Sequence, residues 1–91
     1  MLVIEDAMQT IKARPDFGSL VARAGLTRSE VARAADVSTR TLDALARPEI
    51  YNRSGAVRES TAWKIARGFA QLTQQTPEQA FNALFVEEAQ P

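Results

Sequence analysis

The spacing of its apolar residues constrains this chain most, because they recur every three or four positions in short runs that Pro and Gly separate. Such spacing is typical of amphipathic helices, whose apolar side chains line one face. No stretch alternates apolar β-branched or aromatic residues with polar ones, so strands are disfavoured throughout. The sequence therefore predicts an all-α fold, and its 91 residues suit one compact domain of five or six helices.

Two helices are expected at the start of the chain. The first covers residues 4–13, and Pro15 closes it. It would form an extra N-terminal helix within residues 1–14. The second covers residues 16–24 and stops at Gly25.

The clearest signals for helix starts lie in the middle of the chain. Thr27 and Glu30 form a capping box, in which each side chain accepts a hydrogen bond from the backbone amide of the other residue. The helix that begins there should run to about Ala35. After a link of about three residues, Ser38 caps another helix, which Pro48 ends.

The second half of the chain should hold a loop and two further helices. Residues 49–59 show no helical stripe and are predicted to be a loop. Ser60 or Thr61 can cap a long core helix. Thr76 opens the last helix, with Pro at its first position and a second capping box. Residues 87–91 are expected to form a frayed tail.

The absence of Cys and His excludes several kinds of chemistry. The chain can form no disulfide, none of the usual zinc sites and none of the commonest acid-base or nucleophile pairs. It also lacks a glycine-rich phosphate loop, and its carboxylates are scattered. We therefore expect a protein that is not an enzyme and that needs no cofactor and no metal.

The N-terminus does not resemble a signal peptide, and no apolar run approaches the ~18 residues of a membrane span. A cytoplasmic, nucleoid-associated protein without a membrane partner is expected. The formal net charge is zero, but charge is unevenly distributed. Residues 28–67 carry eight cations and five acids, whereas the chain beyond Arg67 carries three acids and no cation. The middle of the chain can therefore attract phosphate.

Two short helices joined by so few residues favour the crossed arrangement of a helix-turn-helix, whose second helix enters the DNA major groove. The segment after Ser38 has the two faces that this role requires. Leu42 and Leu45 lie on one face, and the other carries Thr39, Arg40, Asp43 and Arg47. A solvated helix with a ladder of weak ion pairs would show the same pattern, so this face alone leaves both interpretations open.

Residues 26–45, LTRSEVARAADVSTRTLDAL, resemble the helix-turn-helix of the Cro/CI-like (XRE-type) repressor family. The shared parts are the L-T start, the V-A in the first helix, the V-S turn and the T-L of the second helix. Residues 64–67, KIAR, are similar to the helix that follows in that family. The resemblance implies a lambda-repressor-like DNA-binding domain with a central helix-turn-helix from about Thr27 to Arg47.

The chain departs from the family at three places. The family commonly has Gln where this chain has Arg28, and often an acid and Gly where it has Ala46 and Pro48. The loop at residues 49–59 is also longer than usual. The last two departures put the path of the chain after the second helix in doubt.

The resemblance also implies which residues read bases. Thr39, Arg40 and Asp43 would face the groove, and Arg28 would reach the backbone or an adjacent base. Arg40 can donate two hydrogen bonds to O6 and N7 of guanine. Asp43 could accept from N4 of cytosine or orient Arg40, and we favour the orienting role.

Phosphate contacts are expected on either side of the groove helix, from the predicted loop and the start of the next helix. The candidates are Arg47, Arg53, Ser54, Arg58, Ser60 and Thr61. Arg14, Arg23 and Arg67 are interpreted as ordinary surface charges, and Trp63 as a packing residue.

The last helix carries Phe81, Leu84 and Phe85, which could fill the core or form a dimer interface. Self-association is frequent in the family that the chain resembles. A homodimer would read a palindromic operator with half-sites about 34 Å apart.

The leading hypothesis is a sequence-specific regulator of transcription, of the repressor type, that binds double-stranded DNA at an operator. An antitoxin of the same fold is a close variant, which would also bind a toxin or another protein partner. A third possibility is a protein-interaction module that keeps the fold and does not bind DNA, which the zero net charge and acidic Asp43 favour.

Overall fold

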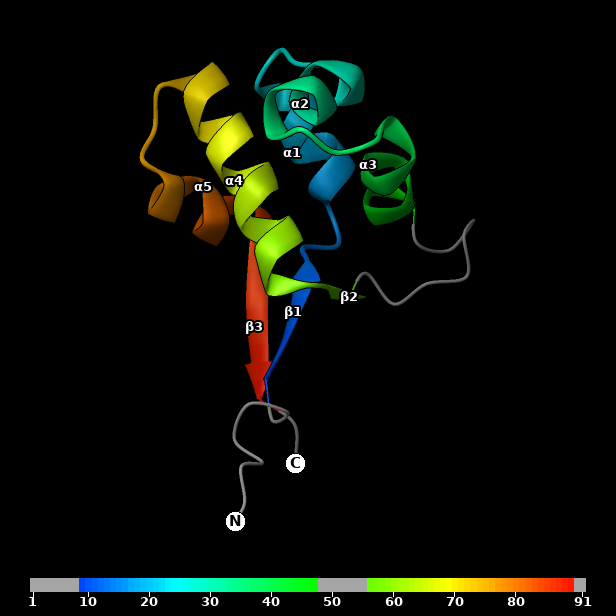
Figure 1. Cartoon of the computed structure of the whole chain (residues 1–91), viewed down its shortest axis with the longest axis vertical. Helices are drawn as coiled ribbons and strands as arrows, with labels where there is room; N and C mark the ends of the chain where they lie inside the picture. The colour runs from blue at the N-terminus through cyan, green and yellow to red at the C-terminus, as the bar shows by residue number, and fades with distance from the viewer. Residues whose placement is uncertain (1–8, 48–55, 90–91) are drawn as a thin grey trace.

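The computed structural model describes residues 9–47 and 56–89, which form five helices and a small three-stranded sheet (Figure 1). In chain order the elements are β1 (Gln9–Ala13), α1 (Phe17–Arg23), α2 (Arg28–Ala35), α3 (Thr39–Ala46), β2 (Ala56–Val57), α4 (Glu59–Thr73), α5 (Pro77–Leu84) and β3 (Phe85–Ala89). The helices form a body at one end, and β1 and β3 extend away from it (Figure 1).

The predicted caps account for the starts of three helices. The Thr27 amide lies 2.8 Å from Oε1 of Glu30, and the Glu30 amide lies 3.1 Å from Oγ1 of Thr27, which completes the capping box of α2. Ser38 caps α3, and Thr76 caps α5 with the second predicted capping box. The three predicted caps are confirmed. They could be predicted from the sequence because capping depends only on residues within one turn of each other.

The long helix α4 is the centre of the core, as its apolar stripe predicts. Ala62, Ile65 and Ala66 are fully buried, and α4 packs against both α2 and α5. Its start differs from the prediction that Ser60 or Thr61 caps it. The helix already begins at Glu59, after an Arg58 N-cap that makes no side-chain cap hydrogen bond.

The sheet corrects the all-α prediction. Residues 9–13 form the central strand β1 rather than the end of a helix, with β2 and β3 antiparallel on either side. Ile11 pairs with Val57 and with Glu87, so both neighbours come from distant parts of the chain. Pairing with β3 along the whole strand, and with β2 at Ile11 and Lys12, gives the backbone of β1 hydrogen-bond partners without a helix. The first part of the predicted helix, residues 4–8, lies outside the described residues.

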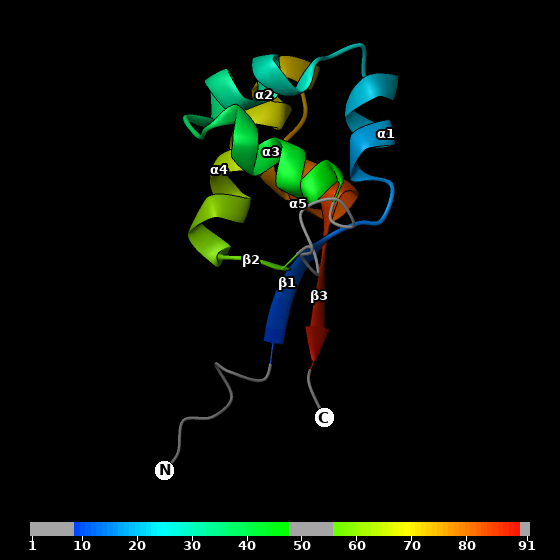
Figure 2. The same cartoon turned by 90° about the vertical axis from the view of Figure 1, so that its right-hand side faces the viewer.

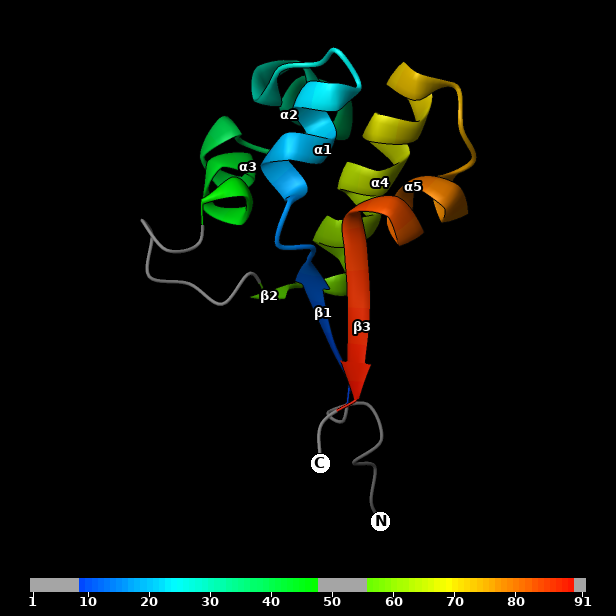
Figure 3. The same cartoon turned by 180° about the vertical axis from the view of Figure 1, so that it is seen from behind.

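The C-terminal segment is also more ordered than predicted. Residues 87–89, which we expected to fray, belong to β3, while residues 90–91 lie outside the described part. Seen from behind, β3 leaves the end of α5 and runs beside β1 (Figure 3). Arg14 links the end of β1 to α5 by hydrogen bonds. Its amide donates to the Leu84 carbonyl at 2.8 Å, and its guanidinium donates to the Asn82 carbonyl at 2.7 and 3.0 Å.

The predicted dimer-interface residues are core residues of the single chain. The exposed fractions of Phe81, Leu84 and Phe85 are 6%, 0% and 1%. The Phe85 ring contacts those of Phe17 and Phe81, at centroid distances of 5.9 and 5.4 Å, and the Trp63 ring stacks on Phe81 at 4.3 Å. Side chains that the chain itself covers present no surface to a second copy, so the interface prediction is corrected to core packing.

Within the described ranges 9–47 and 56–89, no helix has the length and apolar character needed to cross a membrane.

Candidate nucleic-acid interface

The candidate interface is built on α3, which lies at the side of the helical body away from α5 (Figures 1 and 2). On its inner face, Leu42 and Leu45 are buried, with exposed fractions of 0% and 7%. Thr39 and Arg40 are exposed on the first turn. The apolar face of α3 therefore packs into the core, and the polar side chains of its first turn are accessible to solvent.

Ser38 fixes the start of α3. Its Oγ accepts a hydrogen bond from the Thr41 amide at 3.2 Å and lies 2.9 Å from the Thr41 hydroxyl oxygen. Asp36 closes α2 in the left-handed conformation with φ of 61°, and the Val37 amide donates to the Ala32 carbonyl at 3.0 Å. The three-residue connection between the two helices is thus hydrogen-bonded at both ends, which sets the direction in which α3 leaves α2.

An ion pair links α2 to α3. Nε of Arg28, the first residue of α2, lies 3.0 Å from Oδ1 of Asp43 in α3. We predicted from the sequence that Asp43 orients Arg40, and the structure pairs it with Arg28 instead. Arg28 and Asp43 are 15 positions apart, so only the packing of α2 on α3 brings them together.

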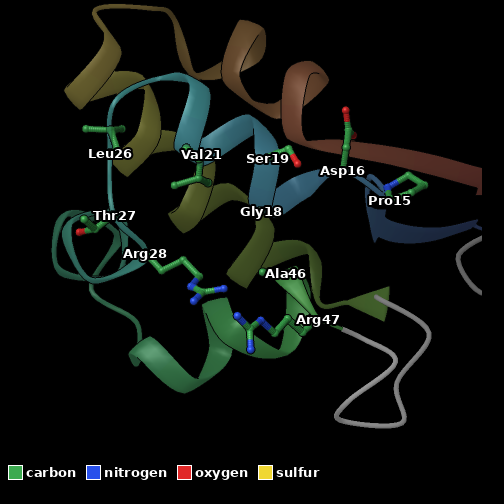
Figure 4. Close-up of a pocket in the computed structure, with 11 residues that line it drawn as sticks. Pro15, Asp16, Gly18, Ser19, Val21, Leu26, Thr27, Arg28, Ala46 and Arg47 are labelled. Atoms are coloured by element: carbon green, nitrogen blue, oxygen red, sulfur yellow. The ribbon is translucent and has the colours of Figure 1, made fainter.

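A pocket of about 510 Å³ lies between α1, the start of α2 and the end of α3. Figure 4 shows that the guanidinium groups of Arg28 and Arg47 point toward each other at its edge. The helices α1 and α3 meet beside it, where a Cβ added to Gly18 would lie 3.3 Å from the Ala46 Cβ. The charge of Arg28 is already offset by Asp43, and Asp16 also lines the pocket, so Arg47 is the cation at this edge that has no carboxylate partner among the described residues.

On another side of α3, a groove of about 330 Å³ separates the helix from β2. Arg40 and Thr41 line it from α3, and Ala56 and Val57 line it from β2. Arg58 follows directly and is exposed. The structure therefore places a further cation next to the strand that borders this groove.

The other predicted phosphate-binding residues have different outcomes. Ser60 is exposed and Thr61 half-buried in the first turn of α4. Arg53 and Ser54 lie outside the described residues. Arg14, interpreted from the sequence as a surface charge, binds a carbonyl of α5 and so belongs to the fold rather than to the interface.

The sequence predicts which residues of α3 share a face, but it does not indicate that Asp43 pairs with Arg28. In the sequence, the carboxylate of Asp43 has two cationic neighbours at helical spacing, Arg40 three positions before it and Arg47 four positions after it. The opposing cation is on another helix, and no local spacing rule points to it.

Comparison with known proteins gives no further assignment, since no family model, curated protein or solved structure matches this chain.

Proposed function

We propose that this chain is a sequence-specific regulator of transcription, of the repressor type, that binds double-stranded DNA. In this proposal α2 and α3 form the helix-turn-helix that the sequence resembles in the Cro/CI-like repressor family, and α3 enters the major groove. Its role is binding rather than catalysis.

The observation that carries the proposal is the exposed first turn of α3 on a helix whose opposite face is buried. Thr39 and Arg40 are exposed next to the Ser38 cap, while Leu42 and Leu45 pack in the core. Recognition helices read base edges through their N-terminal residues. Arg28 pairs with Asp43 of α3 and can contact the DNA backbone or an adjacent base. Arg47 at the end of α3 and Arg58 before α4 can contact phosphates.

The ion pair of Asp43 weakens the main argument against DNA binding. An unpaired carboxylate on the groove face would repel phosphates, which favoured a protein-interaction module from the sequence. Asp43 lies 3.0 Å from Nε of Arg28, so its charge is offset within the protein. The net charge of the whole chain is zero, but the charge near α3 is the relevant quantity.

We further propose that the protein binds its operator as a homodimer, because the proposed fold places one recognition helix on each protomer and a twofold pair reads a palindrome. The contact surface must differ from Phe81, Leu84 and Phe85, which are buried in the core.

The test is selection of bound duplexes from a random DNA pool at near-physiological salt. The expected result is enrichment of one motif, arranged as two inverted half-sites. A folded protein that enriches no motif would contradict the proposal and favour a protein-interaction module, whose partner can be sought by pull-down from the native cell. A toxin captured in addition to a DNA motif would identify the antitoxin variant.

A further inference from the structure

The contact between Arg28 and Asp43 has a particular geometry. It runs through Nε, the guanidinium nitrogen nearest to the main chain, at 3.0 Å from the carboxylate. The two terminal amino groups of Arg28, Nη1 and Nη2, therefore lie at the far end of the guanidinium. They form the outer edge of a planar group that the carboxylate holds from one side.

Both partners remain accessible to a ligand. The exposed fractions of the two side chains are 36% for Arg28 and 32% for Asp43. Figure 4 shows the Arg28 guanidinium reaching from α2 toward Arg47 at the end of α3, rather than folding back onto α1. The guanidinium of Arg28 therefore lies beside α3, the helix that the proposed function places in the groove, and near Arg47 at the end of that helix.

We propose that Arg28 reads a guanine and that Asp43 is its positioning residue, so that the two act as one unit across α2 and α3. This inference rests on the proposed function. Two parallel N–H groups match O6 and N7 of guanine in the major groove. A guanidinium already fixed by a carboxylate loses less side-chain freedom on binding, whereas a phosphate contact tolerates a mobile one.

The unit also explains why an acid is present on this face. Asp43 has no donor to offer a phosphate, and its charge would oppose binding if Arg28 moved away. Binding that keeps the ion pair intact is therefore favoured over binding that breaks it. With Nε paired to Asp43, Arg28 can donate only to acceptors that its terminal amino groups reach in this orientation. This restriction is a source of base selectivity.

The experiment is the same selection from a random pool, performed with the unaltered chain and four variants. Arg28→Ala removes the reader, Asp43→Ala removes the acceptor oxygen, and Asp43→Asn keeps an acceptor while losing the charge. Asp36→Asn is the matched control, because it removes the same charge at an exposed position whose left-handed conformation Asn tolerates. Circular dichroism checks that each variant is folded.

We expect Arg28→Ala and Asp43→Ala to lose preference for guanine at the same position of each half-site, by about ten-fold or more. Asp43→Asn should retain part of that preference, and Asp36→Asn all of it. Binding to unrelated DNA should not weaken in any of the three Asp variants, since each removes a negative charge.

Three results would overturn the inference. If Asp43→Ala keeps the guanine preference, the Asp43 carboxylate does not position Arg28. If Arg28→Ala and Asp43→Ala change different base pairs, the two residues read independently. If Asp36→Asn and Asp43→Ala act equally, the effect is one of net charge. In each case the unaltered chain still enriches a motif, whereas failure of the unaltered chain to enrich any motif rejects the proposed function itself.

Discussion

At the scale of single residues, Arg40 is the side chain whose role the proposed function defines most directly. It is exposed on the first turn of α3, next to the groove that β2 borders. We expect Arg40→Ala to weaken operator binding by about 1–3 kcal/mol and to relax specificity at one base pair. Fluorescence anisotropy with the selected operator and its single-base variants measures both effects.

Arg67→Ala is the control for that experiment, because it removes the same charge from an exposed site on α4. It should leave the base preference unchanged. A loss with Arg40→Ala that is equal for all sequences would instead identify Arg40 as a phosphate contact.

Residues of the candidate site were predictable from the sequence where their role depends on near neighbours. The Ser38 cap and the buried positions Leu42 and Leu45 follow from helical spacing alone. The partner of Asp43 was not predictable, because the ion pair depends on how α2 and α3 cross.

At the scale of elements, the close approach of α4 to α2 explains the glycine in the middle of α4. A Cβ added at Gly68 would lie 2.7 Å from the Ala35 nitrogen and 2.9 Å from the Ala34 carbonyl carbon. These are backbone atoms of α2 and cannot move separately from the helix. We expect Gly68→Ala to destabilise the protein by about 1–3 kcal/mol, although Ala is the better helix former. Urea denaturation measures this change.

Gly18→Ala in α1 is the comparison. Its added Cβ would lie 3.3 Å from the Cβ of Ala46, a small side chain at the end of α3. We expect a smaller change in the free energy of unfolding than for Gly68→Ala. If Gly68→Ala stabilised the chain, as helix propensity alone suggests, the described contact between α2 and α4 would be wrong.

The strands are the elements that sequence reasoning missed. Five residues of β1 carry too short a pattern to distinguish a strand from a helix turn, and β2 has only two residues. Their stability depends on partners from distant parts of the chain, including Val57 and Glu87 opposite Ile11. A pattern read along the sequence contains no information about such pairing.

At the scale of the whole molecule, Phe85 joins the helical core to the sheet. It is the first residue of β3, is 1% exposed, and contacts the rings of Phe17 and Phe81. We expect Phe85→Glu to abolish cooperative thermal unfolding, since it replaces a core ring with a buried charge in a domain whose total stability is about 5–15 kcal/mol. Circular dichroism melting measures this loss.

Leu72→Glu is the matched control, because Leu72 is a large apolar residue that is 39% exposed. It should melt close to the unaltered chain. A Phe85→Glu protein that stays folded and becomes monomeric would instead support the alternative that the last helix forms a dimer interface.

The salt dependence of DNA binding is also a property of the whole molecule, because its slope depends on how many cations, from several elements, contact phosphates. The exposed Arg47 follows α3, and the exposed Arg58 precedes α4. We expect Arg47→Ala and Arg58→Ala each to weaken binding to all sequences alike and to reduce the slope of log K against log salt by about 1. Titrations at several salt concentrations measure the slope. An unchanged slope with a changed base preference would contradict the phosphate role.

What the sequence determined by itself is the set of local features. Thr27, Ser38 and Thr76 start helices because their caps act within one turn, and the apolar stripe of α4 makes it the core helix because burial follows helical periodicity. The polar face of α3 follows from the same periodicity.

Only the tertiary structure decided the rest, because it depends on residues that are distant in the chain. The strand conformation of residues 9–13 requires β2 and β3 as partners, and burial of Phe85 requires α1 and α5 around it. The pairing of Arg28 with Asp43 requires α2 and α3 to be packed together. Each is a contact between elements, and its free energy depends on their relative placement rather than on any local pattern.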